Sequence, residues 1–228
     1  MDGNGRWAAA RGLPRSLGHR AGAQTVRRIV EDCCEVGVKA LTLYAFSWEN
    51  RERPAEEIHE LMGLLDEFIR REAPSMHENH VRLRAIGRLD LLPHEVTANL
   101  RRVIQETAGY DRLTLTLALS YGGRQELVDA MRRIAGLVRE GRVQPEEVDE
   151  ALIRRHLYAP DLPDPDLLIR TSGEQRLSNF LLWQLSYTEL YVTSKFWPDF
   201  SRDDLLEAFA DYERRERRFG KRPVALCP

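Results

Sequence analysis

Cysteine is scarce in this chain of 228 residues, and long apolar runs are missing from it. Cys33 and Cys34 are adjacent and Cys227 stands near the end, so the sequence holds no C-x-x-C pair for zinc or redox chemistry. We therefore predict reduced thiols with a structural role. No apolar run reaches the roughly 20 residues that cross a bilayer, and the first residues lack the charged-then-apolar pattern of a secretion signal. These absences predict a cytoplasmic protein.

An excess of one charge is missing as well. Lys and Arg number 34 and Asp and Glu number 36, which gives a formal net charge of −2. Such a balance creates no overall field that attracts nucleic acid, and we expect no nucleic-acid partner. An anion must then be bound by local arginines and backbone amides. Hydrophobic residues make up 43% and charged residues 31%, as in folded globular proteins, and the length predicts one domain over residues 1–228.

The common nucleotide-binding signatures are absent or incomplete. No G-x-x-x-x-G-K-[ST] loop occurs anywhere in the sequence. Gly3, Gly5 and Ala8 match the G-x-G-x-x-A fingerprint of dinucleotide-binding domains, but that motif requires a preceding strand and an uninterrupted helix. No strand precedes this match, and the residues after it include three that interrupt helices: Gly12, Pro14 and Gly18. The sequence therefore disfavours a nicotinamide enzyme.

Strand-like and helix-like segments alternate along the chain. Five segments have the composition of strands: 38–46, 81–86, 113–119, 167–170 and 190–193. The remaining segments show helical spacing of apolar residues: 21–36, a long helix from 54 with a kink near 74, 95–107, 125–139, 146–157, 180–185 and a last helix capped by Ser201 and Asp204. This order predicts a single α/β domain with a mainly parallel sheet flanked by helices and ligands beyond the carboxyl ends of the strands.

A cluster of glycines beside an acid and a base opens the chain, in the order Asp2, Gly3, Asn4, Gly5, Arg6, Trp7. Glycines let backbone N–H groups approach a diphosphate closely, and the start of a helix adds a favourable dipole. The aspartate can hold Mg²⁺ against the same oxygens. A tight turn stabilised by the Asp2 side chain explains the pattern equally well. Arg15 and His19 follow, and both are available to an anion bound at this turn.

A second polar cluster follows the strand predicted at 38–46 and comprises Ser47, Trp48, Glu49, Asn50, Arg51 and Arg53. An α/β active site is expected at this end of a strand. Ser47 and Asn50 offer hydrogen bonds, and Arg53 can pair with an oxyanion. A polar loop that caps the next helix is an equally good interpretation.

The third cluster follows the strand predicted at 167–170 and reads RTSGEQRLSNF. Arg170, Arg176 and Ser178 lie on this one glycine-containing loop, which predicts a phosphate clamp. An ordinary surface loop can carry these residues too, but it would rarely lead into a segment as apolar as 180–183. Glu189 stands farther on in an apolar run, where a lone carboxylate needs a metal ion or an arginine as its partner.

Taken together, several motifs in this order resemble the cis-prenyltransferase family, typified by undecaprenyl diphosphate synthase: MDGNGRWA, GHRAG, LTLYAFSWEN, RP, YGGR, DLLIRTSGEQRLSNFLLWQ and ELYV. The resemblance runs almost from end to end. It implies an enzyme that condenses isopentenyl diphosphate onto an allylic prenyl diphosphate, a homodimer, and a first strand upstream of Met1. It also implies an apolar tunnel for the prenyl chain, for which the stripe from Ile58 to Ile69 and the strand at 113–119 are candidates. Core packing explains each of those apolar residues as well.

The resemblance also distributes the polar residues over two diphosphate sites. The allylic diphosphate would lie at the opening turn, against Gly3, Asn4, Gly5, Arg6, Trp7, Arg15 and His19. Isopentenyl diphosphate would lie against Arg170, Arg176, Leu177 and Ser178. The cluster after the first strand would contribute further substrate contacts from Ser47, Trp48, Glu49, Arg51 and Arg53.

For the chemical step, the resemblance implies an Mg²⁺ ion held by Asp2 and Glu189, which assists departure of the allylic diphosphate. Asn50 matches the family position assigned to proton abstraction, although an amide is a poor base and can act by positioning instead. The DDxxD motif of trans-prenyltransferases does not occur here. The resemblance also allows peripheral contact of the protein with a membrane, for release of a long polyprenyl product.

Two other functions deserve comparison. A non-catalytic prenyl-diphosphate-binding subunit of the same fold would be expected to lose Asp2, Asn50, Arg170 and Arg176, and all four are present. An unrelated nucleotide- or sugar-phosphate-binding module is suggested by the glycines and arginines alone. The sequence carries no signature for recognising a base, which disfavours that module.

Overall fold

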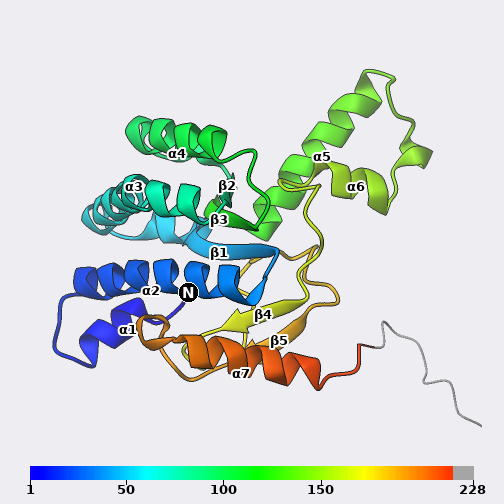
Figure 1. Cartoon of the computed structure of the whole chain (residues 1–228). Helices are drawn as coiled ribbons and strands as arrows, with labels where there is room; N and C mark the ends of the chain where they lie inside the picture. The colour runs from blue at the N-terminus through cyan, green and yellow to red at the C-terminus, as the bar shows by residue number, and fades with distance from the viewer. Residues whose placement is uncertain (218–228) are drawn as a thin grey trace, which may run out of the picture.

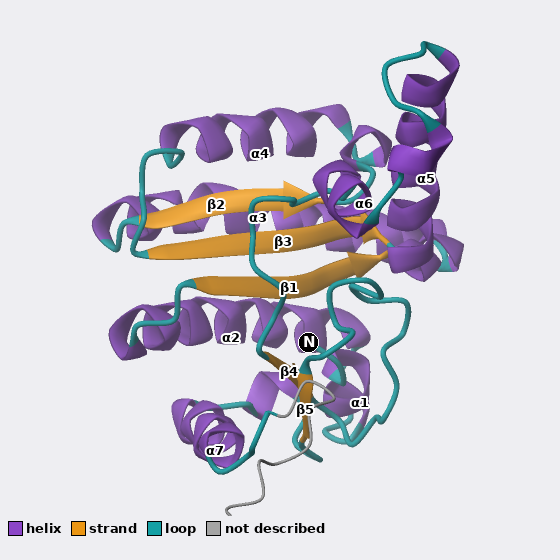
Figure 2. Cartoon of the chain, turned by 90° about the vertical axis from the view of Figure 1, so that its right-hand side faces the viewer, coloured by secondary structure: helices purple, strands orange, loops and turns teal. Residues whose placement is uncertain are grey.

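The computed structural model describes residues 1–217, and its centre is a three-stranded parallel sheet. The strands are β1 (Ala40–Ser47), β2 (Val81–Ile86) and β3 (Leu113–Tyr121), in the order β1-β3-β2 (Figure 2). Strand β3 is buried along nearly its whole length because it lies between the other two. Its alternating leucines and threonines place the leucines on one face of the sheet.

A second, two-stranded parallel sheet follows later in the chain. It consists of β4 (Leu167–Arg170) and β5 (Glu189–Val192), with Arg170 opposite Val192. The strands predicted at 81–86 and 167–170 have the bounds found in the structure, and the other three differ by one or two residues at their ends. The prediction of a mainly parallel sheet is therefore confirmed, since every strand pair is parallel.

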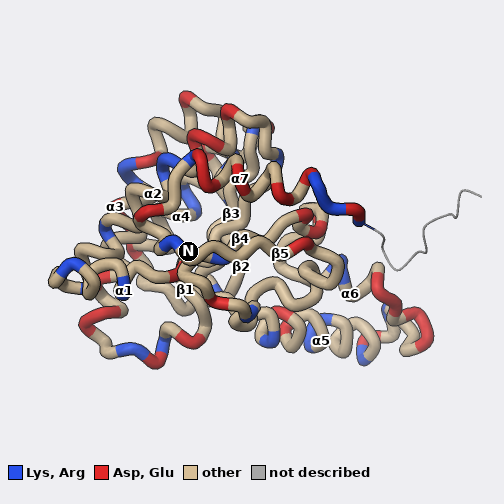
Figure 3. The backbone as a smooth tube through the Cα atoms, turned by 90° about the horizontal axis from the view of Figure 1, so that it is seen from below, with Lys and Arg blue, Asp and Glu red and all other residues tan. Residues whose placement is uncertain are grey.

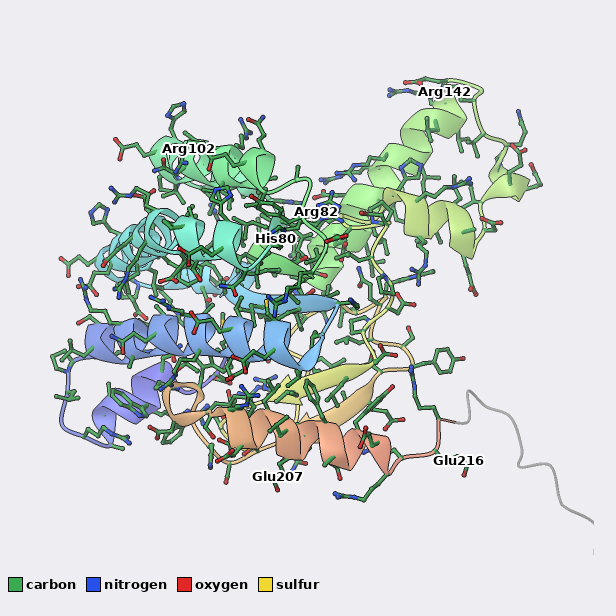
Figure 4. All side chains as sticks on the ribbon, in the orientation of Figure 1. His80, Arg82, Arg102, Arg142, Glu207 and Glu216 are labelled. Atoms are coloured by element: carbon green, nitrogen blue, oxygen red, sulfur yellow. The ribbon has the colours of Figure 1, made fainter. Side chains whose placement is uncertain are left out.

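Seven α-helices surround the sheets (Figure 1): α1 (Asn4–Ala9), α2 (Arg15–Val36), α3 (Ala55–Glu78), α4 (His94–Glu106), α5 (Gly123–Arg139), α6 (Glu150–His156) and α7 (Arg202–Glu213), counted over residues 1–217. Helices α2, α3 and α4 pack on the leucine face of the central sheet and form the main core with it. The capping box of Ser201 and Asp204 at the start of α7 is present as predicted. Arg102 on α4 and Arg142 beyond α5 reach into solvent (Figure 4).

The other face of the central sheet is covered differently from the prediction. Tyr44 and Tyr121 form a second core cluster with Phe180, Leu181 and Leu185. We predicted a helix over 180–185, and this prediction is wrong: the segment is a series of turns with Leu181 at a φ of 41°. Its apolar residues are buried, but the left-handed backbone that precedes them cannot continue as a right-handed helix.

Helix α2 begins earlier than predicted because Gly18 does not interrupt it. Gly18 and Gly22 are buried inside α2 and face α1. A Cβ atom on Gly18 would lie 2.1 Å from the backbone oxygen of Asn4. The glycine therefore permits close contact between two helices, which a sequence pattern does not distinguish from a helix break.

Membrane-spanning segments are not found in the described part of the chain: no helix within residues 1–217 is both long and apolar enough to cross a bilayer. Basic and acidic residues are interleaved along the backbone when the molecule is viewed from below (Figure 3).

The two cysteines of α2 give a direct test of the core. Burial, with the neighbouring Cys34 and Asp32, raises the pKa of Cys33 to about 12, and burial also raises the pKa of Cys34. Because the thiolate is the form that reacts, we expect native protein at pH 8 to leave Cys33 unmodified by iodoacetamide. Peptide mass spectrometry should find both residues alkylated only after unfolding in guanidinium. Rapid native labelling of Cys33 would contradict this packing.

Candidate active site

Three segments that are far apart in the sequence meet at the carboxyl ends of the strands. Strands β1 and β3 end together, with Ser47 opposite Tyr121. The opening turn is fixed at the end of β4, since the Asp2 N–H donates to Thr171 Oγ1 (2.9 Å) and the Thr171 hydroxyl donates to the Asp2 carbonyl (2.8 Å). The Trp197 N–H donates to the same carbonyl at 3.0 Å. The opening turn and the segment after β4, which are two of the three clusters predicted from the sequence, therefore share one site.

Glycine is required at position 3 of this turn. Gly3 has a φ of 99°, and a Cβ atom there would lie 2.1 Å from Ser172 Oγ and 2.7 Å from the ring of Phe196. A larger residue would push the turn away from the loop 170–178, which we call the clamp loop. The structure thus explains the glycine by close packing of turn and clamp loop.

The Asp2 carboxylate lies between two arginines. Arg170 donates to Oδ2 at 3.1 Å, Arg6 lies 3.3 Å from Oδ1, and the Gly3 N–H donates to Oδ1 at 2.7 Å. Burial would raise the pKa of Asp2, but the bonds from Arg170 and Gly3 and the charge of Arg6 outweigh burial and lower it. The carboxylate is therefore ionised at neutral pH, and its side chain remains 38% exposed.

The clamp loop closes on itself through Arg170. This side chain is only 16% exposed, and it donates to Ser178 Oγ at 3.0 Å and to the carbonyl of Arg176. Arg176 is 61% exposed and pairs with Glu174, which also accepts from Arg6 at 2.6 Å. Arg6 and Arg176 thus lie on either side of one carboxylate, and an anion that displaced Glu174 would meet both.

Glu57 on α3 gathers three groups that the sequence placed in two clusters. Arg53 donates to its Oε1 at 2.9 Å, while Arg15 and His19 lie 3.8 and 3.7 Å from the same oxygen. Sequence reasoning missed Glu57, although its position four residues after Arg53 is the spacing of a helical ion pair. Arg15 and His19, which the sequence assigns to an anion at the opening turn, thus both lie beside a carboxylate of α3.

The His19 ring is neutral at pH 7 because its pKa is lowered. Burial and the positive charges of Arg53 and Arg15 lower the pKa of His19, and Glu57 offsets them only in part. Its Nε2 is buried and has no hydrogen-bond partner among residues 1–217. A neutral ring whose Nε2 lies 3.7 Å from Glu57 without a hydrogen bond can still bind a ligand through that nitrogen, but it adds no charge.

The segment after β1 is a 3₁₀ helix, η1 (Trp48–Glu52), with its own capping box. The Ser47 N–H donates to Asn50 Oδ1 at 3.0 Å, and the Asn50 N–H donates to Ser47 Oγ at 3.3 Å. Trp48 carries two cations over its ring, with Arg51 at 5.4 Å and Arg88 at 4.9 Å from the centroid. The capping box closes η1 itself, whereas α3 begins after Pro54 with no side-chain cap, so the segment does not cap the next helix as one interpretation of the sequence had it.

Three other predicted residues contact neighbouring parts of the chain. Asn4 lies against α2, where a Cβ on Gly22 would approach its Oδ1 to 2.4 Å. Trp7 donates to Asp199 Oδ1 at 2.6 Å. Leu177 packs against the second core cluster. These contacts stabilise the turn and the clamp loop from behind.

Glu189 lies apart from Asp2 within one chain. Glu189 begins β5, whereas Arg170, which binds Asp2, pairs with Val192 at the other end of that strand. Glu189 and Val192 are three residues apart, which is roughly 10 Å along the strand. Arg215 donates to Glu189 Oε2 at 2.9 Å. Residues 1–217 contain no group of three or more His, Cys, Asp or Glu side chains that could hold a metal ion. Asp2 would therefore need oxygens from a ligand to complete a metal site.

Comparison with known proteins identifies the family. The family model described as "Putative undecaprenyl diphosphate synthase" matches residues 1–220. The chain belongs to this cis-prenyltransferase family. An isoprenyl transferase from Heliobacterium mobile is 52% identical over 220 residues, which cover 96% of this chain and 85% of the relative. An isoprenyl transferase from Thermotoga maritima is 49% identical, with 96% and 94% covered.

Two solved structures of diphosphate synthases have the same fold. Lavandulyl diphosphate synthase from Lavandula x intermedia, solved with dimethylallyl diphosphate, superposes with a TM-score of 0.94 at 37% identity, over 97% of this chain and 95% of that one. A probable undecaprenyl diphosphate synthase from Campylobacter jejuni gives a TM-score of 0.79 at 36% identity, over 89% and 93%. The resemblance found in the sequence motifs is thus confirmed, and the chain is an isoprenyl transferase.

Proposed function

We propose that this cis-prenyltransferase condenses isopentenyl diphosphate with an allylic prenyl diphosphate, releases diphosphate and forms a new Z double bond. The observation that carries the proposal is the Asp2 carboxylate held between Arg6 of the opening turn and Arg170 of the clamp loop. One carboxylate thus lies between two basic groups that belong to different predicted diphosphate sites. The lavandulyl synthase structure contains an allylic diphosphate, which supports this substrate class.

The two sites divide the arginines between them. The allylic diphosphate is bound by the backbone of the turn, by Arg6 and by Arg15, with neutral His19 as a hydrogen-bonding group. Isopentenyl diphosphate is bound by Arg176 and Ser178, with Arg170 fixing the loop that presents them. Substrate displaces Glu174 from Arg6 and Arg176 on entry, because phosphate oxygens compete for the same guanidinium groups.

The residues present fit Mg²⁺ as a shared ion. Mg²⁺ is commonly bound by one or two carboxylates together with substrate phosphates, and Asp2 is ionised and accessible at the meeting point of the two sites. The ion would neutralise charge on the departing diphosphate. The metal role of Glu189 rests on the family resemblance alone.

In the reaction, the allylic C–O bond breaks and the isopentenyl double bond forms the new C–C bond. A proton then leaves the isopentenyl unit. Asn50 lies at the family position for that step, and its Oδ1 is occupied by the Ser47 N–H. We propose that Asn50 positions the segment 47–53, and that the proton goes to a stronger base such as the released diphosphate.

We further propose a homodimer and an apolar tunnel for the growing chain. Ile69 of α3 and Leu113 of β3, two of the candidate residues, lie in the main core that these elements share. The proposal of a tunnel along these apolar elements rests on the family resemblance.

Incubation with labelled isopentenyl diphosphate tests the proposal. We expect incorporation into a longer allylic diphosphate when dimethylallyl, geranyl or farnesyl diphosphate is supplied with Mg²⁺, and none after chelation by EDTA. Product analysis should find a Z double bond. Binding of the primer without incorporation under all these conditions would instead support the non-catalytic subunit.

A further inference from the structure

Asn179 directly follows the clamp loop, and every polar group of its side chain has a partner. Its Nδ2 donates to Glu49 Oε1 at 2.8 Å and to Gln125 Oε1 at 3.1 Å. Its Oδ1 accepts from the Arg124 N–H at 2.8 Å. An amide offers two donor hydrogens and an acceptor oxygen, and all three are used here.

These partners belong to two of the segments that surround the site. Glu49 lies in η1 after β1, and Gln125 and Arg124 lie in the first turn of α5, directly after β3. Asn179 therefore joins the clamp loop to the carboxyl ends of both strands. Tyr44 supports the same junction, since the carbonyls of Tyr121 (3.1 Å) and Ser178 (3.3 Å) share its one hydroxyl hydrogen.

Helix α5 depends on Asn179 for capping. Its own N-cap residue, Gly122, has no side chain to accept from the first free N–H groups. Asn179 supplies both acceptors: its carbonyl accepts from the Gly123 N–H at 2.6 Å and its Oδ1 from the Arg124 N–H. A Cβ on Gly122 would lie 2.5 Å from Asn179 Nδ2, so the glycine leaves space for this cap.

The backbone around Asn179 is unfavourable by itself. Ser178, Asn179 and Leu181 have φ values of 52°, 61° and 41°. Such left-handed conformations are unfavourable for residues with a side chain and persist only where the surroundings fix them. Asparagine adopts them more readily than most residues, and its side-chain bonds fix the position.

We propose that Asn179 is a positioning residue that holds Arg176 and Ser178 of the clamp loop in the geometry that binds isopentenyl diphosphate. The inference rests on the function proposed above for that loop. Asn179 acts through the loop and through Glu49, and it does not itself contact the reacting atoms. Release of its side chain frees the clamp loop from the segment 47–53, while the family fold remains.

Asn179→Asp separates this role from simple capping. The carboxylate keeps an oxygen for the Arg124 N–H, so the cap of α5 is retained. It loses both donated bonds and brings a second negative charge to the Glu49 carboxylate, at the present bond length of 2.8 Å. We expect KM for isopentenyl diphosphate to rise roughly tenfold or more, with a much smaller change in KM for the allylic primer and in melting temperature.

Asn99→Asp is the matched control. Asn99 donates to Asp66 Oδ1 at 2.7 Å between α4 and α3, so the change places the same two charges together away from the site. We expect this variant to leave KM for isopentenyl diphosphate unchanged. In the double variant Asn179→Asp with Glu49→Gln, the new amide donates to the new carboxylate. If the two positions acted independently, the double variant would raise KM by the product of the two single increases. We expect a smaller increase, which brings KM closer to that of Glu49→Gln alone.

Steady-state kinetics and calorimetric titration with isopentenyl diphosphate measure these effects together. An unchanged KM and affinity in Asn179→Asp, or an equal rise in Asn99→Asp, would overturn the positioning role. Wild-type protein that binds isopentenyl diphosphate without elongating any primer would contradict the proposed function. In that case the calorimetric affinities still test Asn179.

Discussion

Asp2→Ala is expected to lower kcat for isopentenyl incorporation by roughly 10²- to 10³-fold, the usual effect of removing one preorganised electrostatic group from an active site. The metal would lose its protein ligand next to the departing diphosphate. Binding of the allylic diphosphate should be retained or strengthened, because Arg6 and Arg170 lose the carboxylate that now occupies them. Radiolabel incorporation and calorimetry without Mg²⁺ measure the two effects separately.

Asp2→Asn is the control for size. The amide retains an oxygen for the Gly3 N–H, so the turn should keep its shape while the charge is lost. We expect the same loss of kcat and a melting temperature close to that of the wild type. Unchanged turnover in either variant would exclude a metal role for Asp2, and a large fall in melting temperature would indicate that its role is structural.

The second large effect is expected from Gly18→Ala. The new methyl group would lie 2.1 Å from the backbone oxygen of Asn4 and 3.1 Å from the Cβ of Ala8, so α1 has to move away from α2. Overpacking of this kind costs about 1–3 kcal/mol, which lowers Tm by several degrees in a chain of this size. Because the opening turn leads into α1, turnover should fall as well.

Gly63→Ala provides the opposite case in a similar helix. Gly63 lies in α3, and a Cβ there would meet no atom of residues 1–217 within 4 Å. Alanine is favoured over glycine in a helix interior by about 1 kcal/mol, so this variant should gain stability and keep its activity. Differential scanning calorimetry of both variants checks the pair. Equal Tm values for Gly18→Ala and wild type would show that the α1–α2 contact is loose.

Much of the fold was predictable because hydrophobic periodicity is a local signal. The alternating leucines and threonines of β3 and the apolar stripes of α3 and α4 report which face is buried. The segment 180–185 was predicted wrongly for two reasons. Its apolar residues are buried against the face of the sheet opposite the main core, and left-handed residues just before it set the chain into turns. Such non-local causes leave no periodic pattern.

The candidate site was predictable as clusters but not as a set of partners. Arg6, Arg170 and Asp2 were identified separately, and only the folded chain shows that one carboxylate joins them. The neutral state of His19 depends on burial and on Arg53, which lies far away in the sequence. Glu189 needed a partner, and the structure supplies Arg215.

The bonds between Asp2 and Thr171 bridge a sequence separation of 169 residues, and Trp197 reaches the same point from still farther along. Contacts of such long range form slowly, because closing a long loop costs chain entropy before the contact contributes any stability. A ribosome would have to release β4 and η4 (Trp197–Asp199) before the opening turn could acquire its partners, whereas the three-stranded sheet needs only the first 121 residues. Enzyme activity therefore reports completion of folding, while circular dichroism also detects chains in which only the central sheet and its helices have formed.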